Sequence, residues 1–264
     1  MYKIIGIVLG FLFGFGFLGA FIGYLIGSSI DRTKDFGIGG INPLSNSHRK
    51  IIFLETTFTL MGKLAKVDGH ISKDEIAHVE QFIKKMGMTP EHRKQAIEQF
   101  KRGSAPEFDI TETLDTFMAT CGQTLNLKQV LIMYLSIMAF ADGKLDSAEE
   151  QLLKTVANRL GYSDADFKQM LEMLINQSHF SQGSQRKAAS PSALDDAYKA
   201  LGVSKDNSDK EIKTAYRKLM SQYHPDKLIG QGLPEDMIAV ATEQAKEIQV
   251  AYDLIKKHRE GNKS

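Results

Sequence analysis

The residues of this 264-residue chain best suited to chemistry are His224 and Asp226, which stand on either side of Pro225. An imidazole and a carboxylate at this spacing are typical of an acid–base pair, or of two polar groups that a partner recognises. Catalysis also requires a cleft, but the sequence has no glycine-rich phosphate loop and places the turn at the tip of a helical hairpin. We therefore expect the turn to bind a partner and to have no enzymatic activity.

Two amphipathic helices are expected to hold this turn. Apolar residues before it recur at helical spacing: Ile212, Ala215, Tyr216, Leu219 and Tyr223. Apolar residues after Pro234 do the same: Ile238, Ala241, Ala245, Ile248, Tyr252 and Ile255. Pro225 cannot continue a helix and disfavours helical dihedrals at His224, so the first helix ends there. A polar loop joining two antiparallel helices is the simplest arrangement.

Four segments of this region, in order, resemble the J-domain family, the DnaJ-type modules. A short helix over 194–201 ends at Gly202, and Ser208 with Glu211 forms a capping box for the next helix. The matching segments are 197–203, 212–219, 223–227 and 248–252. The resemblance predicts a J domain over 194–264. It implies a helical hairpin that needs no cofactor and stimulates ATP hydrolysis by a DnaK-type chaperone.

The resemblance also implies which residues bind the chaperone. They are the three turn residues and four nearby cations: His224, Pro225, Asp226, Lys213, Arg217, Lys218 and Lys227. Without the adjoining turn, the cations would be interpreted as a solvated helix face. Nucleic-acid binding would also explain a basic helix, but residues 194–260 hold eleven Lys or Arg against twelve Asp or Glu. That balance is unlike a phosphate-binding surface, so no nucleic acid is expected.

The overall charge does not indicate the type of partner, because the 33 basic and 32 acidic residues leave a formal net charge of only +1. Hydrophobic residues make up 42% of the chain, which is ordinary for a globular protein. Cys121 is the only cysteine. A disulfide framework and a four-cysteine zinc site are therefore both excluded.

Residues 4–30 contain no charged side chain. This run is long enough to cross the hydrocarbon core of a bilayer, which is roughly 30 Å thick. A cleaved signal peptide is the alternative, with Lys3 as its charged start. The apolar run continues past Ala20 to Ile26, however, which favours an uncleaved transmembrane helix within an anchor over 1–30.

Glycines recur at every fourth residue in this anchor. The two rows are Gly6, Gly10, Gly14 and Gly19, Gly23, Gly27. Small residues at this spacing let two membrane helices approach closely. We expect a homodimer through Gly10, Gly14, Gly19 and Gly23, although glycine is also common in membrane helices without such a role.

More positively charged residues follow the predicted membrane helix than precede it. Only Lys3 and the amino terminus lie before it, whereas Arg32, Lys34, Arg49 and Lys50 follow. By the positive-inside rule, the C-terminal part lies in the cytoplasm. Residues 31–47, rich in glycine and proline over their second part, are predicted to be a linker.

Residues 48–177 show helical periodicity throughout and no strand alternation. The expected helices cover 48–67, 73–86, 90–102, 110–121, 127–141, 147–160 and 164–176. An internal repeat relates 65–75 to 139–149, each copy being a helix, an Asp-Gly turn and a second helix. The repeated pattern resembles the tellurite-resistance-type, TerB-like family, which implies a helical bundle.

Four carboxylates recur in the two copies: Asp68, Glu75, Asp142 and Glu149. Their oxygens would suit a hard cation if the two copies met, and the resemblance associates the family with metal binding. Neither copy fits an EF-hand loop, however. The alternative is structural, because Ser72 with Glu75 and Asp146 with Glu149 are predicted to form capping boxes.

Residues 178–193 lack periodicity and are predicted to be a flexible tether that lets the last domain move. The predicted protein is thus all-α: one N-terminal transmembrane helix, a TerB-like bundle and a J-domain hairpin. This order resembles the membrane-anchored DnaJ-like co-chaperones of Gram-negative bacteria, which implies the inner membrane and a periplasmic N-terminus. The alternative is a stress-sensing or adaptor scaffold, in which the bundle binds metal or a partner and the J domain only recruits the chaperone.

Overall fold

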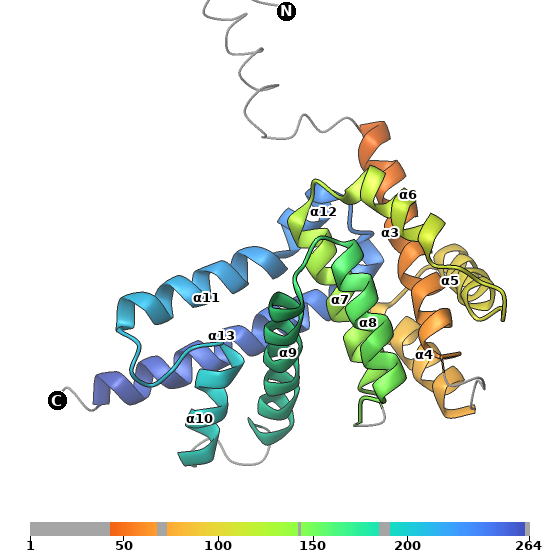
Figure 1. The fold of residues 1–264 in the computed structure, drawn as a ribbon. Coiled ribbons are helices and arrows are strands. Elements are labelled where there is room, and N and C mark those ends of the chain that lie inside the picture. The colour runs from red at the N-terminus through yellow and green to blue at the C-terminus, as the bar shows by residue number, and fades with distance from the viewer. Residues whose placement is uncertain (1–42, 68–72, 142–143, 185–190, 262–264) are drawn as a thin grey trace, which may run out of the picture. The chain divides into compact units, whose positions relative to one another are not determined.

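The structure, a computed structural model, describes residues 43–67, 73–141, 144–184 and 191–261 (Figure 1). The chain divides into two compact units, Met1–Asn46 and Ser47–Ser264. Every side-chain contact described below lies within the second unit. The regular elements of the described residues are all helices, which confirms the all-α prediction.

Seven helices follow one another from residue 43 to residue 184. They are α3 (Pro43–Leu64), α4 (Lys73–Met86), α5 (Pro90–Gly103), α6 (Thr111–Cys121), α7 (Leu125–Ala139), α8 (Ser147–Arg159) and α9 (Asp164–Ser184). Each corresponds to one predicted helix. The limits agree within two residues except that α3 covers 43–64, beginning inside the predicted linker over 31–47, and α9 continues past its predicted end at 176.

Local capping explains why several of these helices begin where they do. The Thr89 hydroxyl accepts the His92 N–H at the start of α5, and Pro90 occupies the first helical position, where no N–H is needed. Asp146 and Glu149 form the capping box predicted for α8. Ser72, predicted to cap α4, lies outside the described residues.

The core of the seven-helix bundle surrounds α7, most of whose side chains are buried. Phe53, Phe117 and Tyr134 are fully buried. The Phe53 ring centroid lies 6.3 Å from that of Phe117 and 6.1 Å from that of Tyr134. Burying one such side chain contributes about 1.5–3 kcal/mol, so these contacts bind α3, α6 and α7 together.

The described residues of the C-terminal part, 191–261, form four α-helices and one 3₁₀-helix. They are α10 (Pro191–Ala200), α11 (Asp209–Tyr223), α12 (Pro225–Gln231), η2 (Glu235–Met237) and α13 (Ile238–Gly261). The long helices α11 and α13 pack against each other (Figure 1). The rings of Tyr216 on α11 and Tyr252 on α13 stack at a centroid distance of 4.1 Å and an interplanar angle of 13°. The predicted helical hairpin is confirmed.

The connection between α11 and α13 is more regular than predicted. We expected a polar loop there, but Pro225 begins the helix α12, which ends before Gly232 at φ 110°. A proline at the first position of a helix loses nothing, because that N–H has no helical acceptor. The prediction that α11 stops before the proline is confirmed, whereas the prediction of an irregular loop is wrong.

The predicted tether over 178–193 is helical for most of its length. Helix α9 runs to Ser184 and α10 begins at Pro191, while residues 185–190 lie outside the described residues. Helices α9 and α10 also pack closely against each other. The prediction of a segment without secondary structure is therefore wrong, and the two parts of the chain are in contact.

No helix within the described ranges is long and apolar enough to cross a membrane. The predicted anchor over 1–30, with its glycine rows, lies outside those ranges.

Candidate functional site

The turn between α11 and α12 carries the residues first singled out in the sequence. His224 has an extended backbone, with φ −64° and ψ 122°, and its carbonyl accepts the Leu228 N–H at 3.0 Å. The side chains of His224 and Asp226 are exposed. Neither makes a hydrogen bond or ion pair with another described residue. Both polar groups are therefore available to a partner.

Three of the four predicted cations form an exposed face on α11, next to this turn. Lys213, Arg217 and Lys218 are exposed and make no hydrogen bond or ion pair in the described part of the chain. The fourth cation, Lys227, donates from Nζ to the Ser221 hydroxyl at 2.7 Å. Three positive charges without a partner in the described ranges thus lie on the helix that precedes the turn.

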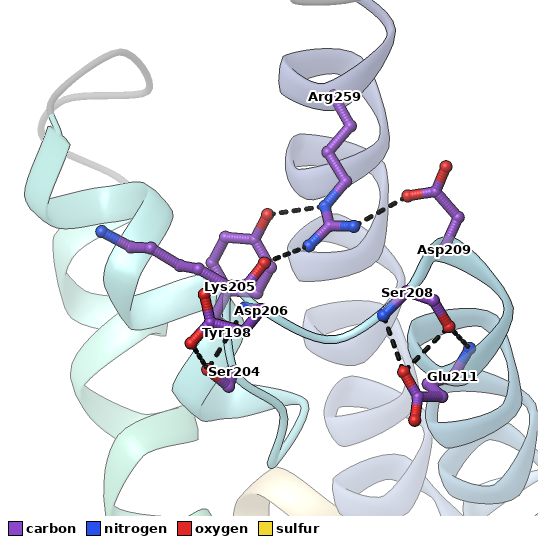
Figure 2. A network of polar contacts seen from close by, with 8 residues as sticks. All are labelled: Tyr198, Ser204, Lys205, Asp206, Ser208, Asp209, Glu211 and Arg259. Carbon is purple, nitrogen blue, oxygen red and sulfur yellow. Dashed lines mark hydrogen bonds and ion pairs between the residues drawn. The ribbon is translucent and has the colours of Figure 1, made fainter.

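Arg259, near the end of α13, holds the connection between α10 and α11 (Figure 2). Its guanidinium donates to the Tyr198 hydroxyl and to an Asp209 carboxylate oxygen, both at 2.9 Å, and to the Lys205 carbonyl at 2.6 Å. It also lies over the Tyr198 ring, 5.5 Å from the centroid. These contacts fix the start of α11 against the end of α13.

The start of α11 is further set by the predicted capping box (Figure 2). Glu211 accepts the Ser208 N–H at 2.7 Å, and the Ser208 hydroxyl accepts the Glu211 N–H at 3.3 Å. The hydrogen bonds from Ser208 hold the pKa of the Glu211 carboxyl below its usual value. The cationic face is therefore carried by a helix that is fixed at its first turn.

The predicted metal-binding carboxylates remain a hypothesis. Asp68, Asp142 and the side chain of Glu75 lie outside the described residues. The Glu149 carboxylate accepts the Asp146 N–H at 3.0 Å, as the capping alternative predicts. Among the residues that the structure describes, no group of three or more His, Cys, Asp or Glu could hold a metal ion.

Charged residues join the bundle to the C-terminal part, and sequence reasoning missed them. One Asp236 carboxylate oxygen lies 2.6 Å from His92 Nδ1 and accepts the Thr89 N–H at 3.2 Å, next to the N-terminus of α5. Lys50 pairs with Glu235 at 3.1 Å. A carboxylate at a helix N-terminus is electrostatically favourable, so these contacts hold η2 at a defined position on the bundle.

Buried hydrogen bonds join the same two parts. Gln177 donates to the Ala200 carbonyl at 2.9 Å and accepts from Gln244 at 2.5 Å. The buried Tyr134 hydroxyl donates to the Met237 carbonyl. Because buried polar groups are costly when unpaired, these bonds favour one arrangement of the C-terminal part on the bundle. The predicted free movement on a tether is replaced in this structure by a packed contact.

Three family models match the chain. The model "Tellurite resistance protein TerB" matches residues 55–172, and the DnaJ domain model matches residues 196–261. The third, "Co-chaperone DjlA transmembrane domain", matches residues 1–45. No solved structure matches the chain.

Curated relatives resemble the chain over most of its length. A protein of Shewanella oneidensis named "Co-chaperone protein DjlA" is 37% identical over 212 residues, which cover 80% of each chain. Its namesake in Photobacterium profundum is 35% identical over 239 residues, covering 88% of this chain and 86% of its own. The Coxiella burnetii protein of that name is 37% identical over 210 residues, covering 79% and 78%.

Proposed function

The chain belongs to the DjlA family of co-chaperones, and we propose that it stimulates a DnaK-type chaperone through the His224-Pro225-Asp226 turn at the inner membrane. It is a J-domain co-chaperone with a membrane anchor. The observation that carries the proposed site is the turn itself, where an exposed imidazole and an exposed carboxylate have no partner among the described residues and lie beside a cationic helix face. We propose that the chain regulates a partner's ATPase and does not catalyse a reaction itself.

The cationic face supports recognition by complementary charge. Lys213, Arg217 and Lys218 are exposed on the helix that ends at the turn. Unpaired charges of one sign accelerate the encounter with a surface of the opposite sign, and salt weakens this effect. We infer that the cationic face orients the chain on an acidic surface of the chaperone, so that the turn meets its site.

Raising the ionic strength is therefore expected to slow association with the chaperone. The Debye length falls from about 10 Å at 0.1 M salt to about 3 Å at 1 M, which screens the face from its target. Stopped-flow or surface-binding kinetics would measure the association rate. Arg217→Glu should lower that rate and its salt dependence, whereas Lys94→Glu, an exposed change on α5, should leave both close to the parent. Salt-independent association would contradict the steering role.

The proposed topology puts the N-terminus in the periplasm and the bundle and J domain in the cytoplasm of a Gram-negative cell. Its support is the excess of Lys and Arg after the apolar run over 4–30. Reporters fused after Ser264 test it: one active only in the cytoplasm should work, and one active only in the periplasm should be silent. The opposite result would separate the J domain from a cytoplasmic chaperone.

We also propose that the anchor dimerises through Gly10, Gly14, Gly19 and Gly23. Close backbone packing drives association in lipid, and leucine at such a position holds the helices apart. A membrane two-hybrid reporter should therefore show weaker self-association for Gly14→Leu than for Phe17→Leu, which lies at similar depth. Equal signals for both variants and the parent would exclude this dimer. Two J domains on one membrane patch would raise their local concentration.

A further inference from the structure

The Ser221 carbonyl lies in the last turn of α11 and has no donor within that helix. In an α-helix the carbonyl of residue i accepts the N–H of residue i+4, so the donor for Ser221 would be residue 225. Proline has no N–H. Because α11 ends at Tyr223, its last four carbonyls have no donor within the helix, and for Ser221 the proline also rules out the residue that would stand in register.

The bundle supplies the missing donor. Asn126, the second residue of α7, donates from its side-chain amide to the Ser221 carbonyl at 3.3 Å. Asn126 is one of the buried polar residues in the described part of the chain and is 7% exposed. A buried amide without a partner is costly, so this bond fixes α7 against the end of α11.

Ser221 is also held from the other side of the turn. Its hydroxyl accepts the Lys227 ammonium at 2.7 Å, which bridges from α12 back to α11. Helix α7 packs against both α11 and α12. Tyr223, the residue before His224, is buried as well. The polypeptide on both sides of the turn is therefore anchored, while His224 and Asp226 stay exposed.

We propose that Asn126 is a positioning residue for the His-Pro-Asp turn. The bundle then forms part of the J-domain site: it supplies a donor that the end of α11 lacks and fixes the direction in which α11 presents His224 and Asp226 to the chaperone. This inference rests on the proposed function. It assigns the TerB-like bundle a role in chaperone stimulation, exerted through the position of the turn.

Gln177 provides a matched control. It is also a buried amide of the bundle that donates to a carbonyl of the C-terminal part, but its acceptor is Ala200 at the end of α10. Gln177→Leu removes a bond of the same kind away from the turn. Gln177 makes a second buried bond, to Gln244, so its loss should destabilise the fold at least as much as Asn126→Leu.

The test is a titration of the DnaK-type chaperone with the full-length chain, measuring the maximal rate of ATP hydrolysis and the half-saturating concentration. For Asn126→Leu we expect the half-saturating concentration to rise roughly tenfold, the factor that a change in one hydrogen bond can produce. Gln177→Leu should lower the thermal midpoint by as much or more, yet keep the half-saturating concentration within about twofold of the parent. Asn126→Asp keeps the size of the side chain but places an acceptor against the Ser221 carbonyl, so it should raise the half-saturating concentration as Asn126→Leu does. This variant replaces Asn126→Leu in the test if the leucine variant does not fold.

Two results would overturn the inference alone. One is a parental half-saturating concentration for both Asn126 variants. The other is a rise shared equally by Asn126→Leu and Gln177→Leu, which would indicate general destabilisation. A parent chain that gives no stimulation at any concentration would instead overturn the proposed function, and the inference with it.

Discussion

Replacing His224 by Gln is expected to abolish stimulation of the chaperone while the chain stays folded. The imidazole is exposed and forms no hydrogen bond or ion pair within the described residues, so its loss removes no internal contact. Surface substitutions of this kind change the free energy of unfolding by less than about 0.5 kcal/mol. The ATPase rate of the chaperone should fall to its unstimulated value, at an unchanged thermal midpoint.

A second exposed imidazole provides the control for this variant. His258 is exposed and lies in the last turn of α13, at the opposite end of that helix from η2. His258→Gln should retain the parental stimulation. Full stimulation by His224→Gln would show that the turn does not act on the chaperone, and would remove the site proposed for it.

The largest expected loss of stability follows from Gly103→Ala. Helices α3 and α5 cross so closely that a Cβ atom at Gly103 would lie 1.8 Å from the Thr59 carbonyl oxygen, and one at Gly62 would lie 2.0 Å from that of Phe100. Backbone cannot rotate away as a side chain can, so the helices must separate. Overpacking of this severity costs about 3 kcal/mol.

Thermal unfolding of the full-length chain in detergent measures this effect. For a domain of this size, 3 kcal/mol corresponds to a fall of about 10 °C in the midpoint. Gly230→Ala is the matched control, because a Cβ there meets nothing within 4 Å, and it should change the midpoint little. A parental midpoint for Gly103→Ala would mean that α3 and α5 are not in close contact.

Sequence reasoning succeeded for most of the bundle because helix limits depend on local signals. Thr89 and Pro90 mark the start of α5, and Asp146 with Glu149 marks that of α8, and the structure shows these caps. It failed at α12, since a proline ends one helix but can equally begin another. It also failed at the end of α9, whose Ser- and Gln-rich composition hides the fact that the helix continues.

The residues of the proposed site can likewise be divided into those with a local sequence signal and those without one. One short stretch of sequence contains His224, Asp226 and the three exposed cations of α11, so their spacing was enough to find them. Contacts between the bundle and the hairpin have no such signal: Asn126 and Ser221 are 95 positions apart, and His92 and Asp236 are 144 apart. Nothing in one sequence links such residues. The role inferred for the bundle therefore required the structure.

The most direct test of the chaperone function is single-turnover ATP hydrolysis by a DnaK-type chaperone, measured against increasing concentrations of the full-length chain in detergent or nanodiscs. We expect the hydrolysis rate to rise with the concentration of the chain and to saturate as the turn occupies its site on the chaperone. A rate that stays at the unstimulated value over the whole range would contradict the assignment of this chain as a J-domain co-chaperone.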